Sequence, residues 1–161
     1  MSKERMAPLV LFVCTGNTCR SAMAEAFCRL ALPPGSRWRV ASAGLSTSSG
    51  KPASTNTIQA VAELGGDISA HRSQPMSPEL ASDAALIVTM TYGHADYLRS
   101  YYPDARDRIY LLASFLPNRT DKPIDDPFGG TLEDYRACRD LIRKAVMGLV
   151  RYLEQIDTSC K

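Results

Sequence analysis

The chain is organised around residues 9–21, which read LVLFVCTGNTCRS. The first five of these residues are apolar and predict a buried strand, and a helical pattern begins at Ala22. Between them lies a short polar turn, residues 14–21. A strand that ends abruptly before a helix places several backbone N–H groups and the positive end of a helix dipole around one small volume. The sequence therefore predicts an anion-binding loop at residues 14–21.

Two side chains of this loop have the chemistry to act on a bound anion. Cys14 directly follows the strand, and the loop N–H groups together with Arg20 would stabilise its thiolate, which would then be a strong nucleophile. The planar guanidinium of Arg20 can bind two oxygens of a phosphate at once. A nucleophile that faces a bound phosphate indicates phosphoryl transfer.

Two other interpretations of the loop are weaker. If Cys14 and Cys19 were metal ligands, a second closely spaced pair of Cys or His would be needed, and Arg20 would repel the cation. A nucleotide-binding loop would need a Gly-Lys-Ser or Gly-Lys-Thr ending, which this loop lacks. We therefore expect neither a metal nor a cofactor at this site.

Length and composition limit what the rest of the chain can be. The chain has 161 residues, 45% of them hydrophobic, which suits one domain with a single core. The net charge is only +2 and the basic residues are scattered, so nucleic acid is not an expected partner. Residues 1–8 contain no apolar segment long enough for a signal peptide or a membrane span. Five cysteines without framework spacing indicate a reducing compartment, so we expect a cytoplasmic protein without membrane association.

The hydrophobic pattern alternates strands and helices along the chain. Strands are predicted at residues 9–13, 38–42, 84–90 and 108–112. Helices are predicted from residue 22 to Pro33, from 54 or 55 to 64, and at 77–81, 93–102 and 131–156. This alternation predicts a three-layer α/β fold, in which a parallel sheet is covered by helices on both faces. We expect one domain over residues 9–157, a flexible extension at 1–8 and a frayed tail at 158–161.

The string CTGNTCRSAMAE at residues 14–25 resembles the phosphate loop of the low-molecular-weight protein tyrosine phosphatase family. The resemblance covers almost the whole chain and implies a flavodoxin-like sheet of four strands. It also implies hydrolysis of a phosphorylated protein side chain through a phosphocysteine on Cys14. Phosphate oxygens would then be held by the Arg20 side chain and by the loop amides of Thr15, Gly16, Asn17, Thr18, Cys19 and Arg20.

The resemblance further implies a general acid in a loop ahead of the last helix. In this family the acid is an aspartate that directly precedes a proline. Asp126 matches this pattern in the string DDPFGG at residues 125–130, and Asp125 is the second choice. One carboxyl group can protonate the leaving group in the first step and deprotonate water in the second. In isolation such a string is more typical of a plain turn.

A set of polar residues is implied to brace the loop. Ser21 is expected to donate its hydroxyl to the Cys14 sulfur, a role compatible with capping the helix. The family pattern adds Asn17, Ser42 and His71 to the same hydrogen-bond network, with His71 reaching Ser21. From the residues alone, each of these three would be an ordinary turn residue.

Three further residues have open roles, and two of them lie in the loop. Gly16 is expected either to allow close approach of the ligand or to adopt a positive φ. Cys19 is implied by the resemblance to form a reversible disulfide with Cys14, which would protect the nucleophile, while structural filler is the alternative. His94 is expected on the solvated outer face of a helix.

Two residues bear on the choice of substrate. Thr18 stands where phosphotyrosine-specific members of the family usually carry isoleucine or valine. Bacterial members that resemble protein arginine phosphatases carry threonine there, within the same string CTGNTCRS. Phe128 stands where tyrosine-directed members commonly place tyrosine. We therefore expect phosphoarginine in preference to phosphotyrosine. Asp126 would then also bind the cationic guanidinium.

Two alternatives come from other functional classes. An arsenate reductase would use a similar loop but needs further cysteines as a relay, and residues 80–92 contain none; Cys138 and Cys160 lie on the last helix and tail. A non-catalytic phosphate-binding module would not need Cys14, Arg20 and Asp126 together. The partners expected from the sequence are therefore phosphorylated proteins, with phosphate or another oxyanion in the site.

Overall fold

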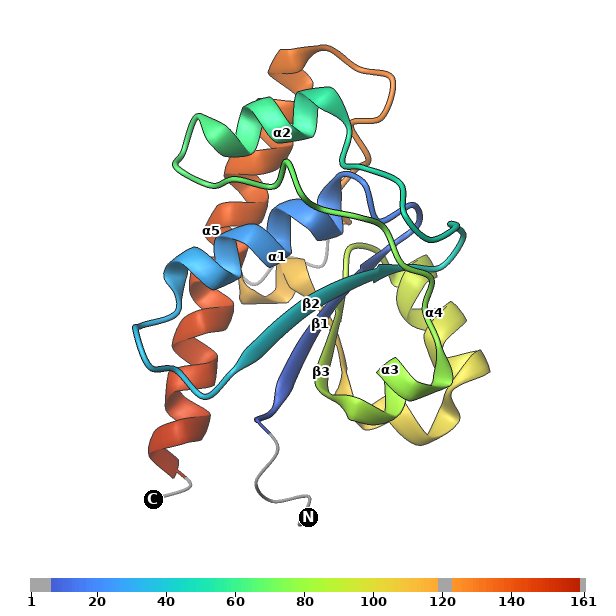
Figure 1. Cartoon of the computed structure of the whole chain (residues 1–161). Helices are drawn as coiled ribbons and strands as arrows, with labels where there is room; N and C mark the ends of the chain where they lie inside the picture. Colours follow the sequence, from blue (N-terminus) through green and yellow to red (C-terminus); the bar gives the residue numbers. More distant parts are fainter. Residues whose placement is uncertain (1–6, 119–122, 160–161) are drawn as a thin grey trace.

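A computed structural model describes residues 7–118 and 123–159 (Figure 1). Four parallel strands form one sheet in the order β2-β1-β3-β4. The strands are β1 (Leu9–Cys14), β2 (Arg39–Gly44), β3 (Ala84–Thr89) and β4 (Ile109–Leu111). In β1, Val10 and Phe12 belong to one apolar core, and Leu11 and Val13 belong to the other. The continuous apolar run is thus explained by a central strand that is covered on both faces.

Helices cover both faces of this sheet, which confirms the expected α/β fold (Figure 1). On one face lie α1 (Arg20–Ala31), α2 (Thr55–Ala62) and α5 (Leu132–Ser159), which pack on one another. On the other face lie α3 (Pro78–Asp83) and α4 (Tyr92–Tyr101). The buried stripe of α5 repeats at helical spacing, as its sequence pattern predicts.

The structure differs from the expectation around β4. The predicted strand at residues 108–112 is only three residues long, because the 3₁₀ helices η2 (Pro103–Arg108) and η3 (Leu112–Phe115) take up its two ends. Periodicity did not reveal these short turns, since an apolar run does not distinguish a strand from a buried 3₁₀ turn.

Both ends of the domain make defined contacts. Helix α5 continues to Ser159, two residues beyond the predicted end of the domain at residue 157. Asp157 connects the last turn of α5 to residues 37 and 38. Its carboxylate accepts hydrogen bonds from Arg37 Nε at 2.7 Å and from Trp38 Nε1 at 3.2 Å. At the start, the carbonyls of Ala7 and Pro8 accept hydrogen bonds from Arg39. The rest of both predicted end segments, 1–6 and 160–161, lies outside the described residues.

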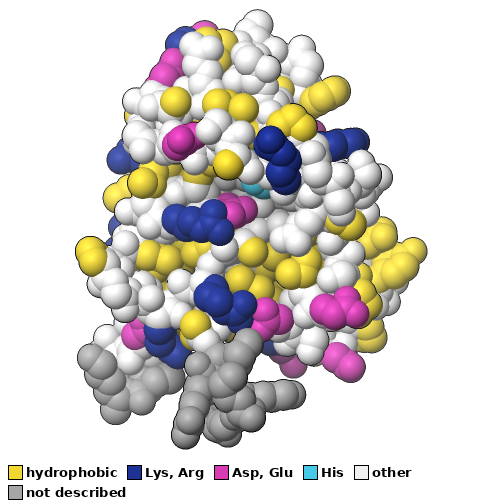
Figure 2. All heavy atoms as spheres, viewed as in Figure 1, with side chains coloured by type: hydrophobic (Ala, Val, Ile, Leu, Met, Phe, Trp, Pro, Cys, Tyr) yellow, Lys and Arg dark blue, Asp and Glu magenta, His cyan; other side chains and the backbone are white. Residues whose placement is uncertain are grey.

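The molecular surface carries charges of both signs in a scattered arrangement, on the face that Figure 2 shows. Exposed aromatic side chains gather at the edge formed by α4, where Tyr92, Tyr97 and Tyr101 are exposed and the last two rings stack. Within residues 7–118 and 123–159, no helix combines the length and the apolar character needed to cross a bilayer.

Candidate active site

The predicted anion-binding loop lies at the carboxyl end of β1, where it leads directly into α1. The N-terminus of α1 has no side-chain cap at Cys19 and no acidic residue in its first turn. The other four α-helices of the described chain are each capped by a hydroxyl, from Ser54, Ser77, Thr91 and Thr131. The first N–H groups of α1 are therefore left for a ligand, and the helix dipole favours an anion there.

The sharp turn of this loop is made at Asn17, which has a φ of 59°. Gly16 does not have a positive φ, so that part of the expectation is wrong. A Cβ at Gly16 would meet only Thr18 Oγ1, at 3.6 Å, so the glycine leaves open space beside the loop. Gly44, at the end of β2, allows a close approach, because a Cβ there would lie 2.7 Å from the carbonyl oxygen of Thr15. Asparagine is tolerated in the left-handed region because its short polar side chain bonds locally.

A chain of hydrogen bonds leads to the Cys14 sulfur and fixes its role as acceptor. Ser42 donates its hydroxyl to the carboxylate of Glu25, so it can only accept from Asn17 Nδ2, at 2.9 Å. Asn17 Nδ2 also donates to Ser21 Oγ at 2.9 Å. The Ser21 hydroxyl hydrogen is then free to bond the Cys14 sulfur at 2.9 Å, and the Asn17 N–H approaches the same sulfur at 3.3 Å. Two donors therefore point at the sulfur of Cys14, which acts as the acceptor of both hydrogen bonds.

His71 takes part in this network at a different point from the one expected. Its Nε2 donates to the backbone carbonyl of Asn17 at 2.7 Å, whereas the Ser21 hydroxyl is occupied by Asn17 and Cys14. Gln74 completes the bracing, because its N–H donates to Asn17 Oδ1 at 2.9 Å. Sequence reasoning missed Glu25 and Gln74, although Glu25 lies within the string CTGNTCRSAMAE.

The guanidinium of Arg20 is buried, with 5% of its side chain exposed, and has one nitrogen to spare. Its Nη1 donates to the carbonyl of Ile124 at 2.9 Å, and its Nη2 lies 3.5 Å from Asp126 Oδ2. Its Nε is buried without a hydrogen-bond partner among the described residues. A buried donor without a partner is rare in proteins, and an oxyanion bound in the pocket would supply the acceptor for this nitrogen. Arg20 is thus ready to bind an oxyanion.

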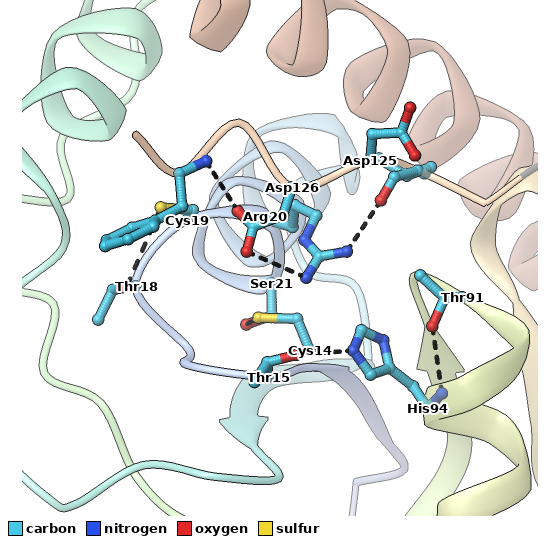
Figure 3. Close-up of polar contacts among 12 residues, drawn as sticks. Cys14, Thr15, Thr18, Cys19, Arg20, Ser21, Thr91, His94, Asp125 and Asp126 are labelled. Carbon is cyan, nitrogen blue, oxygen red and sulfur yellow. Dashed lines mark hydrogen bonds and ion pairs between the residues drawn. The ribbon is translucent and has the colours of Figure 1, made fainter. Parts of the chain in front are cut away.

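The loop of residues 123–130 holds Asp126 beside Arg20, and Figure 3 shows this pair. The loop is anchored at Ile124, whose N–H donates to the carbonyl of Met90 at 2.9 Å. Asp126 accepts a hydrogen bond from the N–H of Phe128 and keeps 45% of its side chain exposed. Asp126 lines the pocket above the phosphate loop, and Asp125 does not. The geometry therefore favours the first choice for the acid.

A pocket of about 230 Å³ lies over the phosphate loop. Besides residues 14–20 it is lined by Asp126 and Phe128, and by three residues that sequence reasoning missed: Ser46, Thr47 and Lys51. Lys51 brings a second cationic side chain to the pocket. Phe128 is 78% exposed at its rim, and Thr18 is half-buried in its wall. A small pocket with two cationic side chains suits a phosphorylated group.

His94 is placed very differently from its expected position on a solvated helix face. It is only 8% exposed, and its Nε2 lies 3.0 Å from Thr15 Oγ1 (Figure 3). Burial, followed by the nearby Arg20 guanidinium, lowers the pKa of His94 to about 4, while Asp126 acts in the opposite direction. The imidazole is therefore neutral at physiological pH. Its 79-residue separation from Thr15 in sequence left no local signal of this contact.

We expect His94 to make the folded protein less stable as the pH falls. In the unfolded chain the imidazole has a pKa of 6.5, against about 4 in the folded protein. Between these values only the unfolded state gains the proton, so the free energy of unfolding falls as the pH drops through this window. The His94→Gln variant has no such proton. The measurement is the Tm of the variant minus the Tm of wild type at two pH values. This difference should be more positive at about pH 5 than at about pH 7.5. A difference that does not vary with pH would contradict the prediction.

The described cysteines are all free thiols. Two of them, Cys14 and Cys19, lie in the phosphate loop, and the other two, Cys28 and Cys138, lie on helices α1 and α5. The sulfur of Cys19 contacts Ser54 Oγ at 3.4 Å and the Tyr135 hydroxyl at 3.9 Å. Burial raises the pKa of both Cys28 and Cys138 to about 12, which makes these two thiols poor nucleophiles. Reactivity is therefore expected in the loop.

Cys14, Arg20 and Asp126 thus surround one pocket at the carboxyl end of β1. These three side chains suit one class of chemistry, phosphoryl transfer through a cysteine. Comparison with known families agrees: residues 9–159 match the low molecular weight phosphotyrosine protein phosphatase family, and the chain belongs to it.

Individual relatives have three different activities in their names. A protein-arginine-phosphatase of Geobacillus stearothermophilus is 39% identical over 145 residues, which cover 90% of this chain and 95% of the relative. EpsP of Ralstonia nicotianae, a probable low molecular weight protein-tyrosine-phosphatase, is 33% identical over 88% of this chain and 92% of its own. Arsenate reductase 1 of Staphylococcus epidermidis is 33% identical over 85% and 91%, respectively.

Solved structures confirm the fold. The YwlE arginine phosphatase from Geobacillus stearothermophilus superposes with a TM-score of 0.87 at 37% identity, covering 94% of this chain and 96% of that one. A serine mutant of YwlE arginine phosphatase, with its active-site serine phosphorylated, gives a TM-score of 0.85 at 31% identity, with coverage of 91% and 95%.

Proposed function

We propose that this protein is a protein-arginine phosphatase that acts through a phosphocysteine on Cys14. One observation carries the proposal: the Cys14 sulfur accepts two hydrogen bonds in a pocket where Arg20 has a buried Nε without a described partner. The nucleophile and the phosphate-binding group thus share one small volume. The likeness to protein-arginine-phosphatases supports the choice of substrate.

In the first step the Cys14 sulfur attacks phosphorus and the bond from phosphorus to the substrate nitrogen breaks. Asp126 gives its proton to this nitrogen, so that the arginine side chain leaves as a guanidinium cation rather than as the strongly basic neutral guanidine. The loop amides and Arg20 hold the equatorial oxygens, over which the charge of the transition state spreads. Asp126 is half-exposed on an anchored loop, a position from which it can reach a leaving group.

In the second step water attacks the phosphocysteine and the bond from phosphorus to sulfur breaks. Asp126, now a carboxylate, takes the proton from water. The departing sulfur gains negative charge, which the Ser21 hydroxyl and the Asn17 N–H are placed to stabilise. The products are inorganic phosphate and the free Cys14 thiolate.

Substrate choice is assigned to Thr18 and Phe128, which line the pocket. The polar contact of the Thr18 hydroxyl in the described structure is a distant one, 4.0 Å to Cys19 Sγ, so the hydroxyl is available to water or to a guanidinium. An aliphatic residue would instead pack against an aryl ring. The protein is expected to hydrolyse phosphoarginine peptides with a higher kcat/KM than phosphotyrosine peptides. A higher kcat/KM for phosphotyrosine peptides would instead identify the protein as a tyrosine phosphatase.

Replacing Thr18 by isoleucine should shift this preference towards phosphotyrosine. The change removes a hydroxyl and adds apolar surface to the pocket wall, and an effect of this kind is worth roughly tenfold in relative kcat/KM. The measurement compares both peptides with wild type and variant. Thr18→Ser, which keeps the hydroxyl, serves as the control and should retain the wild-type preference. An unchanged ratio in Thr18→Ile would remove Thr18 from the argument.

We also propose that Cys19 protects the nucleophile from oxidation. Hydrogen peroxide would convert the Cys14 thiolate to a sulfenic acid, and the Cys19 sulfur would then displace water to form a disulfide. Cys19 must turn away from Ser54 and Tyr135 to do so. Two external thiols would then reduce this disulfide and regenerate both cysteines, which suits the reducing compartment that the cysteine usage indicates.

After peroxide treatment, wild type should regain its activity with dithiothreitol, and Cys19→Ser should not. Without the resolving thiol, the sulfenic acid proceeds to forms that dithiothreitol does not reduce. Residual activity and the mass of the Cys14 peptide provide the measurement. Cys138→Ala, which removes a buried thiol of the same domain, is the matched control. Full recovery in Cys19→Ser would show that Cys19 has no such role.

Arsenate reduction is the less supported function. The likeness to arsenate reductases covers most of the chain, but residues 80–92, where the relay cysteine is expected, contain none. Cys138 is buried and has a pKa raised to about 12 by that burial, which suits a resolving thiol poorly. Thioredoxin-coupled reduction of arsenate by the pure protein would favour the arsenate reductase over the phosphatase.

A further inference from the structure

Among the described residues, two buried side-chain atoms that can form hydrogen bonds have no partner, Arg20 Nε and His94 Nδ1. The first is explained by the anion that the loop is built to bind. The second is not, because the mechanism above uses no histidine. His94 lies in the first turn of α4, where its backbone N–H is capped by Thr91 Oγ1 at 3.2 Å. Its position is therefore fixed by the helix start.

The missing partner of Nδ1 indicates which nitrogen of His94 carries the proton. A neutral imidazole has one N–H donor and one acceptor nitrogen. If the proton were on Nδ1, it would be a buried donor without an acceptor, and such orphans are rarer than under-satisfied acceptors. The proton therefore belongs on Nε2, which lies 3.0 Å from Thr15 Oγ1. His94 is the donor in this bond and Thr15 is the acceptor.

This direction decides what the Thr15 hydroxyl can do. Its oxygen accepts from His94, so its single hydrogen must point to another acceptor. Thr15 is exposed and lines the phosphate pocket. Its backbone cannot swing away, because its carbonyl accepts a hydrogen bond from Ser46 N–H at 2.9 Å. In the free protein water can be this acceptor, because Thr15 is exposed, and an oxygen of a phosphoryl group bound in the pocket would take its place.

We propose that His94 is a positioning residue of the phosphate loop, which directs the Thr15 hydroxyl as a hydrogen-bond donor to the bound phosphate. The proposal rests on the proposed function for the identity of the ligand, but the binding of inorganic phosphate does not require turnover. The low pKa of His94 agrees with a neutral ring that has one proton to give.

Binding of inorganic phosphate to the full chain, followed by calorimetry, tests the pair. His94→Leu and Thr15→Val should each weaken binding by roughly tenfold to a hundredfold, the range for loss of one hydrogen bond to a charged group. The double variant should bind no more weakly than either single one, because both changes remove the same donor. His94→Gln, whose amide nitrogen can donate from a similar place, should recover most of the affinity.

Four results would overturn the proposal. They are full phosphate affinity in Thr15→Val, additive losses in the double variant, no recovery in His94→Gln, or ¹⁵N spectra of wild type that place the proton on Nδ1. The spectra and Thr15→Val decide the matter even if His94→Leu fails to fold. Failure of the proposed function would appear differently, as wild type that binds phosphate but does not hydrolyse phosphoarginine.

Discussion

Replacing Cys14 by serine should abolish turnover while the protein still binds phosphate. A serine hydroxyl has no thiolate to offer, and loss of a catalytic nucleophile lowers kcat by roughly 10⁴-fold or more. The loop amides, the uncapped N-terminus of α1 and the guanidinium of Arg20 are unchanged by the substitution. Phosphate binding should therefore be retained, and loss of the negative thiolate removes a charge that repels the anion.

Steady-state kinetics with a phosphoarginine peptide, and calorimetry with inorganic phosphate, provide the two readouts. Cys28→Ala is the matched control. Cys28 lies on α1, the helix that follows the loop, but it is buried in the core, where burial raises its pKa to about 12. It should keep its activity. Turnover at the wild-type rate in Cys14→Ser would disprove the phosphocysteine route. This conclusion would hold whether the substrate is phosphoarginine or phosphotyrosine.

Replacing Asp126 by asparagine should lower kcat by about 10² to 10⁴-fold, the range for a lost general acid and base. The amide cannot give a proton to the leaving nitrogen and cannot take one from water. It keeps the size of the side chain, so binding should change less than kcat. Asp125→Asn is the matched control, since Asp125 is adjacent in sequence but does not line the phosphate pocket.

The leaving group separates the two roles of Asp126. p-Nitrophenyl phosphate has a leaving group that needs little protonation, so its first step should be nearly normal in Asp126→Asn, while the second step still lacks its base. The variant should then release one equivalent of nitrophenol per active site in a rapid burst. Equal losses in Asp125→Asn and Asp126→Asn would contradict the assignment of the acid.

Much of the site could be predicted because it is local in the chain. The loop from Cys14 to Arg20 is contiguous, and its position between a strand and a helix follows from hydrophobic periodicity. Its nucleophile and its phosphate-binding arginine were therefore visible in seven residues. The resemblance to a family was needed for Asp126, because an aspartate in a turn has no distinctive signal of its own.

The layered α/β fold, the buried central strand and the loop at its carboxyl end follow from the sequence, since periodicity and turn chemistry act over a few residues. Three features became visible only in the folded molecule: the turn at Asn17 rather than Gly16, the hydrogen bond from His71 to the carbonyl of Asn17, and the burial of His94 against Thr15. The last two join elements that only the assembled sheet and its helices bring together. Local pattern contains no information on such distances.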